Sequence, residues 1–195
     1  MWDQRYAGDE YRFGTLPNRF LIDCAASLKP GKMLSLGEGE GRNAVYLARL
    51  GFEVTAVDGS AVGLAKARRL AAEQGVALTT ITADLNDYLI QPAAWDGIMD
   101  FFCHLPRAER IPLHQRVIAG LKPGGVYILE IFAPLQPQLA TGGPVDRDLL
   151  MSEEEAREEL ADLDLRIVRE IVRHREEEDP TTESLAVLQV MGVKP

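Results

Sequence analysis

The stretch from Lys32 to Asp58 constrains this chain more than any other part of its sequence. A short apolar run ends in three alternating glycines, a helical pattern follows, and a second apolar run ends in an aspartate. This order predicts a strand, a turn, a helix and a strand. Glycines at the first turn let backbone N–H groups approach a ligand at a helix N-terminus. A carboxylate about 20 residues further on is placed to accept hydrogen bonds from ribose hydroxyls. The stretch therefore predicts half of a nucleoside-binding site.

Length and charge limit the class of protein. The chain has 195 residues, 46% of them hydrophobic, and a formal net charge of −9. This length predicts a single domain. The charge argues against nucleic acid as a partner, since that needs a basic face, and the basic cluster from Lys66 to Arg69 fits the solvated face of a helix. No apolar run approaches the ~20 residues of a membrane span, and the first residues lack a signal pattern. We expect a cytoplasmic protein with no membrane partner.

The cysteines and histidines show no metal-ligand spacing. Cys24 and Cys103 lie far apart and are expected to be free thiols. His104, His114 and His174 are not spaced as ligands of one metal ion. We interpret His114 as a helix-surface residue and His174 as a strand residue, and we expect no metal site.

Strand and helix patterns alternate through the middle of the chain. Strands are expected at Met33–Leu36, Glu53–Asp58, Ala77–Thr82, Gly97–Phe102 and Val126–Phe132. Helices are expected at Trp2–Ala7, Asn18–Ser27, Arg42–Leu50, Ala61–Gln74 and Arg107–Gly120. Such alternation predicts a parallel sheet with right-handed crossovers. A sheet of this kind binds ligands outside the carboxyl ends of its strands.

The last third of the chain changes character. Ser152 is expected to cap a helix that runs to about Leu160. Two strand-like segments follow, Leu165–Arg175 and Ser184–Val193, and the polar loop between them makes an antiparallel hairpin necessary. Leu121–Gly125 reads as a helix stop and a tight turn into the fifth strand. The predicted fold is therefore α/β: a doubly wound, seven-stranded, mostly parallel sheet with a C-terminal antiparallel hairpin.

The glycine spacing distinguishes between nucleoside ligands. In the NAD fingerprint the third glycine follows the second by three residues. Counted from Gly37 and Gly39, that position is Arg42, whereas the third glycine here is Gly41. The spacing and the C-terminal hairpin both argue against a nicotinamide-dependent oxidoreductase.

From Met33 to Val193 the chain resembles the class I S-adenosylmethionine (SAM) dependent methyltransferases. That family combines a Gly-x-Gly-x-Gly loop after strand one with an acid that ends strand two. Trp2-Asp3-x-x-Tyr6, Gly41-Arg42-Asn43 and Thr141-Gly142-Gly143-Pro144 resemble a small bacterial branch near the tellurite-resistance type enzymes. The resemblance implies a Rossmann-like core, SAM as cofactor and S-adenosylhomocysteine as product.

The resemblance also implies a set of cofactor-binding residues at the strand ends. These are Gly37, Glu38, Gly39, Gly41, Asp58, Gly59, Ser60, Asp84, Leu85, Phe101 and Cys103. In the family pattern Asp58 holds the ribose hydroxyls, with Gly59 and Ser60 beside the adenine. Asp84 matches the acid that accepts from the adenine amino group, with Leu85 offering its N–H, although Asp84 also fits an ordinary turn.

One position departs from the family pattern. The acid that usually begins the loop motif is Ser35 here, and the loop instead carries Glu38 and Glu40. In related proteins that acid helps to position the methionine amino group. Either Glu38 replaces it or backbone carbonyls hold the amino group.

His104 is the candidate catalytic base, because it follows strand four where the transferred methyl should point. It could equally contact the substrate or a lid, or have a structural role. A base is needed only if the acceptor must lose a proton near neutral pH, and a thiolate or chalcogen oxyanion would not need one. Cys103 also fits a packed thiol, and Glu130 is expected to lie too deep in its strand to act.

The expected organisation is a single methyltransferase domain over residues 1–195. Residues 1–31 form an N-terminal helical lid segment, whose aromatic side chains either close over the ligand or pack on the domain, and residues 32–195 form the SAM-binding core. Ala133–Met151 is expected to be a structured lid rather than a helix. We expect methyl transfer to a small-molecule acceptor, and a monomer or homodimer. The alternative function is a non-catalytic module that binds SAM or its product.

Overall fold

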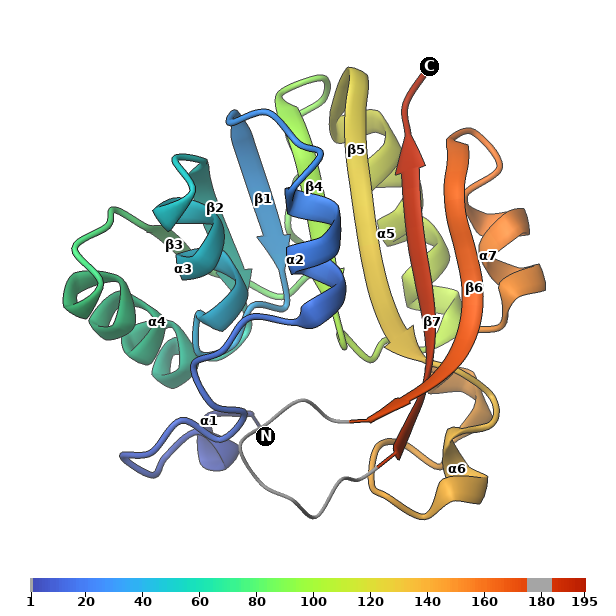
Figure 1. Cartoon of the computed structure of the whole chain (residues 1–195), viewed down its shortest axis with the longest axis horizontal. Coiled ribbons are helices and arrows are strands. Elements are labelled where there is room, and N and C mark those ends of the chain that lie inside the picture. The colour runs from blue at the N-terminus through green and yellow to red at the C-terminus, as the bar shows by residue number, and fades with distance from the viewer. Residues whose placement is uncertain (1, 175–183) are drawn as a thin grey trace.

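The computed structural model describes residues 2–174 and 184–195, and these contain one seven-stranded sheet (Figure 1). Its strands are β1 (Lys32–Leu36), β2 (Glu53–Asp58), β3 (Thr79–Thr82), β4 (Trp95–Phe101), β5 (Leu121–Phe132), β6 (Asp164–His174) and β7 (Ser184–Val193). Its helices are α1 (Trp2–Arg5), α2 (Arg19–Ala25), α3 (Arg42–Arg49), α4 (Ala61–Glu73), α5 (Arg107–Gly120), α6 (Gln136–Leu139) and α7 (Glu153–Glu159). The polar loop expected between the last two strands lies outside the described residues.

The strand order confirms the predicted fold class. The order is β3-β2-β1-β4-β5-β7-β6, with every pair from β3 to β5 parallel. β7 is antiparallel to both β5 and β6, which confirms the C-terminal hairpin. The direction of strand addition reverses between β1 and β4. In a doubly wound sheet such a reversal opens a crevice for ligands at the carboxyl ends.

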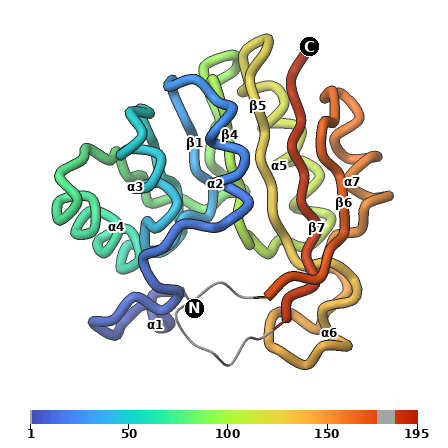
Figure 2. Tube along the Cα trace, viewed as in Figure 1, coloured from blue at the N-terminus to red at the C-terminus, as the bar shows by residue number. Residues whose placement is uncertain are grey.

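Helices cover both faces of the sheet (Figures 1 and 2). On one face Phe20 of α2, Leu47 of α3 and Leu64 of α4 share a buried cluster. On the other face Val117 of α5 and Ala156 of α7 share a second one. Full burial of each such side chain contributes roughly 1.5–3 kcal/mol. The two apolar layers hold the sheet rigid, so that its carboxyl edge can position a site.

Three helices begin at the capping residues that the sequence favours. The side chain of Asn18 accepts a hydrogen bond from Phe20 N, and that of Ser60 accepts one from Gly63 N. Ser152 and Glu155 form a reciprocal capping box at the start of α7. These side chains satisfy backbone N–H groups that have no partner within their helices.

The structure corrects several local expectations. The loop expected at 133–151 includes α6 and a 3-10 turn at Arg147–Leu149, because side chains such as Gln136 satisfy its backbone groups locally. β5 already begins at Leu121, and the expected turn survives as an irregularity in its pairing with β4. His114 was wrongly interpreted as a surface residue; it is 1% exposed and contacts Glu159 and Tyr127.

The described helices are all too short or too polar to cross a membrane.

Candidate functional site

The three glycines after β1 all adopt left-handed backbone conformations. Their φ values are 60° at Gly37, 65° at Gly39 and 95° at Gly41. A Cβ at Gly37 would lie 3.0 Å from the Cβ and Sγ of Cys103, and a Cβ at Gly39 would lie 2.6 Å from the hydroxyl of Tyr6. Glycine is therefore required here both by the backbone conformation and by side chains that approach from other segments.

Gly41 has a different reason to be glycine. It is the N-cap residue of α3, and a Cβ there would lie 2.7 Å from the Cα of Ala67 in α4. The third glycine thus allows α3 to pack closely on α4. Its effect on a ligand is indirect, since it fixes where the first turn of α3 lies.

Asp58 ends β2 and its carboxylate links two ligand-facing loops. Its Oδ2 accepts the backbone N–H of Gly39 at 2.8 Å, and its Oδ1 accepts that of Ser60 at 2.7 Å. Burial raises the pKa of Asp58, although these two hydrogen bonds oppose the shift. A carboxylate has about four lone-pair sites, so each oxygen keeps capacity for one more donor. This is the capacity that a ribose diol requires.

Glu38 is bound to the beginning of α3. Its Oε1 accepts the N–H groups of Asn43 at 3.1 Å and Ala44 at 3.0 Å, and its other oxygen accepts the hydroxyl of Ser35. Burial raises its pKa to about 7 against these bonds. Ser35 and Glu38 are therefore hydrogen-bonded to each other where the resemblance leads us to expect one acid. Whether Glu38 also contacts a methionine amino group stays a prediction.

Of the four residues expected around the adenine, two are exposed to solvent and two are buried. Gly59 and Asp84 are exposed, and the Oδ1 of Asp84 accepts Asn86 N at 2.9 Å, as in an ordinary aspartate turn. Leu85 is buried. Ser60 is also buried, and its hydroxyl donates to Asp3 of α1 at 2.5 Å. Ser60 thus caps α4 and also binds the N-terminal segment. The sequence did not indicate this second contact.

The N-terminal segment lies directly against the glycine loop. Asp3 accepts Val62 N at 3.2 Å in addition to the Ser60 hydroxyl. Tyr6 is only 6% exposed, and its ring would lie 3.0 Å from a Cβ built at Gly63. Sequence reasoning placed an aromatic segment near the ligand but did not single out Tyr6. Its signal was the Trp2-Asp3-x-x-Tyr6 spacing, which puts Asp3 and Tyr6 on one side of a helical turn.

Arg68 and Arg69 are exposed, as expected of a solvated basic face, but Lys66 is not. It is 7% exposed, with its Nζ 2.7 Å from the Oε1 of Glu40 and 2.7 Å from the backbone oxygen of Glu10. The other oxygen of Glu40 accepts Arg12 N at 2.8 Å. Charges within α4, the glycine loop and residues 10–12 therefore hold these three segments together. Helical spacing alone could not reveal a partner at Glu40.

The turn after β4 carries an aromatic cluster. Phe102 has a left-handed φ of 59°, and its N–H donates to the backbone oxygen of Glu130 at 2.8 Å. The ring of His104 stacks on Phe132 with centroids 5.3 Å apart, and Phe102 lies 4.8 Å from Phe132. A Cβ at Gly143 would lie 2.9 Å from the Phe132 ring. The 133–151 segment therefore covers this cluster from outside.

His104 is electrically neutral near pH 7. Burial, followed by the positive charge of Arg5, lowers its pKa to about 4. Its Nδ1 is buried and has no hydrogen-bond partner among residues 2–174 and 184–195. Such an atom is available to a ligand group. A base with this pKa is poorly matched to removing a proton at neutral pH.

Phe101 and Cys103 flank this turn on the core side. Phe101 ends β4 and is buried, and the N–H of Cys103 donates to Asp100 at 3.3 Å. Burial raises the pKa of the Cys103 thiol well above its usual value, so the thiol stays protonated. This supports the interpretation of Cys103 as a packed thiol beside Gly37 rather than a nucleophile.

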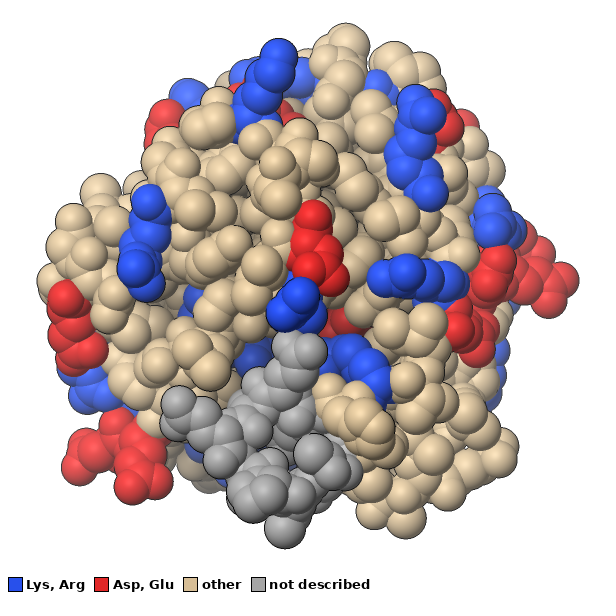
Figure 3. Space-filling view, in the orientation of Figure 1, with Lys and Arg blue, Asp and Glu red and all other residues tan. Residues whose placement is uncertain are grey.

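Glu130 is fully buried within a polar network. Its carboxylate accepts hydrogen bonds from Asn18, Arg173 and Gln189, each at 2.6 Å. Basic side chains gather at this end of the molecule, beside the grey segment in Figure 3. The network ties β5 to the last two strands and to the start of α2.

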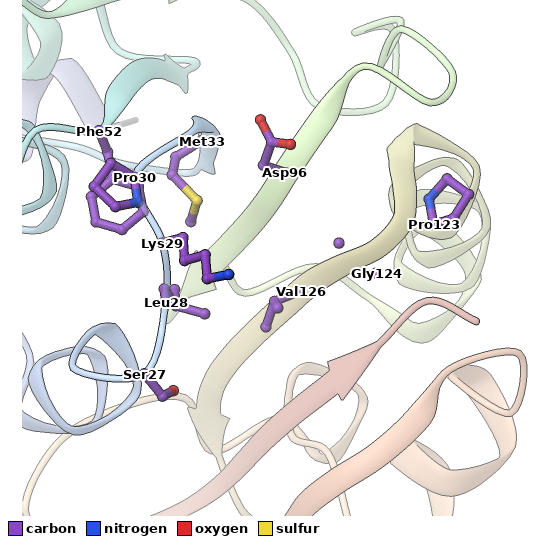
Figure 4. A pocket seen from close by; sticks show the side chains of 11 residues that line it. Ser27, Leu28, Lys29, Pro30, Met33, Phe52, Asp96, Pro123, Gly124 and Val126 are labelled. Atoms are coloured by element: carbon purple, nitrogen blue, oxygen red, sulfur yellow. The ribbon is translucent and has the colours of Figure 1, made fainter.

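A cavity of about 340 Å³ lies at the opposite, amino edge of the sheet (Figure 4). Met33, Phe52, Asp96 and Val126 are among the residues that line it. None of the predicted site residues does. The candidate site is therefore the carboxyl edge, where the glycine loop, Asp58 and the aromatic cluster meet.

Comparisons with known proteins show what this chain is similar to. A family model described as "Methyltransferase domain" matches residues 33–125. The chain is 39% identical over 80 residues to carboxy-S-adenosyl-L-methionine synthase of Geobacter metallireducens, which is 40% of this chain and 33% of that protein. It is 30% identical over 135 residues to 2-heptyl-1-hydroxyquinolin-4(1H)-one methyltransferase of Mycobacteroides abscessus, which is 66% of this chain and 56% of that one.

A third relative has a solved structure. The probable S-adenosyl-L-methionine-dependent methyltransferase TehB of Haemophilus influenzae is 34% identical over 94 residues, or 47% of this chain and 32% of TehB. The crystal structure of TehB superposes with a TM-score of 0.76 at 20% identity, over all of this chain and 66% of the other. The sequence matches thus span between about a third and just over half of these relatives. The superposition shows the shared fold.

Proposed function

Because this chain belongs to the class I SAM-dependent methyltransferases, we propose that it transfers a methyl group from SAM to a small-molecule acceptor. One observation supports this most strongly: the glycine loop after β1, Asp58 after β2 and Asp84 after β3 lie at the same edge as His104 after β4. That edge adjoins the reversal in strand order, where doubly wound sheets bind nucleosides.

The residues at this edge fit SAM. Asp58 has one free lone pair per oxygen for the ribose hydroxyls. The left-handed glycines bring backbone N–H groups to the first turn of α3, and Asp84 and Leu85 lie one strand further for the adenine. When bound, SAM supplies an electrophilic methyl on its sulfonium sulfur and leaves as S-adenosylhomocysteine.

The protein's own contribution is alignment and exclusion of water. Tyr6 closes over Gly39 from one side and Cys103 packs on Gly37 from the other. Phe102, His104 and Phe132 form an apolar wall where the acceptor would stand. Alignment of two reactants in a dry site accounts for much of the rate in such displacements.

The acceptor we propose is one that ionises without help, such as a thiol or a chalcogen oxyanion. The low pKa of His104 supports this, since a neutral imidazole can orient an acceptor but removes a proton poorly at pH 7. One relative is named for a hydroxyquinolinone acceptor, which also suits a small-molecule site. His104 therefore contacts the acceptor through Nδ1 in this proposal.

A release assay for S-adenosylhomocysteine tests the function. The purified protein is given SAM and a panel of thiols, selenite, amines and phenols, while calorimetry measures SAM binding separately. We expect binding together with release for at least one thiol or oxyanion. Binding without release across the panel would favour the non-catalytic module. Absence of both would contradict the proposal.

A further inference from the structure

Arg5 is a charged residue of the N-terminal segment that packs against the glycine loop. Arg5 is exposed on α1, and its guanidinium lies 4.7 Å from the centre of the Trp2 ring. Within the described part of the chain it forms no ion pair with a carboxylate. An arginine stacked on an aromatic ring is held in place without losing its charge.

Arg5 and His104 are each next in sequence to a residue that approaches the glycine loop. Tyr6, the residue after Arg5, touches Gly39, and Cys103, the residue before His104, touches Gly37. Burial is the main cause of the lowered pKa of His104, and the positive charge of Arg5 adds to it. The wall next to them is apolar, with Phe132 stacked under His104.

Four acidic residues in and around the glycine loop are already engaged. Glu40 pairs with Lys66, Asp58 accepts two backbone N–H groups, and Glu38 accepts the first N–H groups of α3. Asp3 is bound to Ser60 and Val62. Among the described residues, Arg5 is therefore a cation near the glycine loop without a carboxylate partner, and the exposed acid Asp84 lies after β3, on the other side of the strand-order reversal from His104.

We propose that the acceptor is an organic anion whose apolar body lies against Phe132 and whose negative group faces Arg5. This rests on the proposed methyl-transfer function and assigns to Arg5 the selection of acceptors by charge. The unpartnered Nδ1 of His104 meets the polar atom that receives the methyl. An acceptor built this way combines an aromatic or aliphatic thiol with a carboxylate-like group.

Binding of matched probes tests this without requiring turnover. The protein is saturated with S-adenosylhomocysteine and titrated with para-(methylthio)benzoate and with para-(methylthio)benzamide, which differ in charge but share a ring. We expect the benzoate to bind about 10-fold more tightly, a preference that falls as salt is added. The kcat/KM for methylation of para-mercaptobenzoate should exceed that for para-mercaptobenzamide by the same factor.

Variants identify the group responsible. Arg5→Gln should remove the preference for the benzoate while leaving S-adenosylhomocysteine affinity unchanged, and Arg5→Lys should keep part of it. Arg49→Gln removes an equivalent exposed charge at the far end of α3. It should change neither the preference for the benzoate nor the affinity for S-adenosylhomocysteine. Phe132→Ala should weaken both ring probes equally.

Three outcomes would overturn the inference: no binding of either probe, equal binding of both, or a preference that survives Arg5→Gln. Selenite turned over in preference to para-mercaptobenzoate would also overturn it, since selenite has no apolar body. All of these differ from a failure of the proposed function, which would show first as no binding of SAM or its product.

Discussion

At the scale of single residues, the three loop glycines are required for different reasons. Gly37 and Gly39 make room for Cys103 and Tyr6, which close the ligand edge, whereas Gly41 makes room for the backbone of α4. The sequence alone predicted one purpose for all three, close approach to a nucleoside. What it could not contain is the identity of the approaching atoms, because those belong to segments far away in the chain.

Replacement of Gly41 by alanine separates backbone strain from close packing. Gly51 offers a matched control, because its φ of 90° is close to the 95° of Gly41 but no atom lies within 4 Å of its Cβ position. Gly51→Ala should lower the unfolding free energy by roughly 1–2 kcal/mol through backbone strain. Gly41→Ala should lower it by the same strain plus about 1–3 kcal/mol from overpacking against Ala67. Urea denaturation measures both. Equal losses would show that α3 and α4 can move apart freely.

The half-buried Glu38 makes stability depend on pH. Its pKa of about 7 exceeds the usual value of about 4.3 for an unfolded chain. Between those pH values the folded state holds more protons than the unfolded one, so stability falls as pH rises. We expect a loss on the order of 2 kcal/mol across this range.

Glu38→Gln should flatten that pH dependence, measured as urea unfolding free energies from pH 4.5 to pH 8. Part of the slope should remain, because burial also raises the pKa of Asp100 to about 7. An unchanged slope in Glu38→Gln would mean that Glu38 titrates normally.

At the scale of elements, the N-terminal segment is fastened to the core by charge as well as by aromatic packing. Lys66 of α4 links Glu40 of the glycine loop to the backbone of Glu10. Asp3 of α1 adds two hydrogen bonds at the start of α4. The segment expected to be either a lid or a packed surface thus has features of both, since Tyr6 is buried and Trp2 is 36% exposed.

Removal of Lys66 should leave a buried carboxylate unpaired. Lys66→Met is therefore expected to destabilise the fold by about 3–5 kcal/mol, whereas Lys32→Met, which removes one partner of an exposed pair with Glu53, should cost under about 1 kcal/mol. Thermal and urea unfolding compare the two. Similar small losses would indicate that water reaches Glu40 freely in solution.

The hydrophobic periodicity of the sequence predicted the helices and strands well, but it did not predict which side chains pair across them. The strand Glu53–Asp58 and the helix Arg107–Gly120 have the expected bounds, because alternation and helical spacing are local properties. The burial of His114 and Lys66 could not be predicted, because it depends on Glu159 and Glu40, which only the folded chain brings near. Within the site, Asp58 was predicted from its place at a strand end, while the roles of Asp3, Tyr6 and Arg5 depend on how a distant segment docks.

At the scale of the whole molecule, the sheet separates two edges. The amino edge holds the cavity near Met33 and Phe52, and the carboxyl edge holds the glycine loop, Asp58 and the aromatic wall. The reversal of strand order between β1 and β4 makes the second edge the ligand edge. The single-domain organisation, with a lid segment in residues 1–31 and a core in residues 32–195, stays a prediction.

Binding of SAM to the Asp58→Ala variant tests the account most directly. Calorimetric titration compares the wild-type protein, Asp58→Ala, and Asp96→Ala, which removes a carboxylate from the amino edge. Circular dichroism confirms that each variant is folded. We expect Asp58→Ala to weaken SAM binding about 100-fold or more, through loss of two charge-assisted hydrogen bonds to the ribose, and Asp96→Ala to bind like the wild type. A folded Asp58→Ala protein that binds SAM as tightly as the wild type would contradict the placement of the site at this edge.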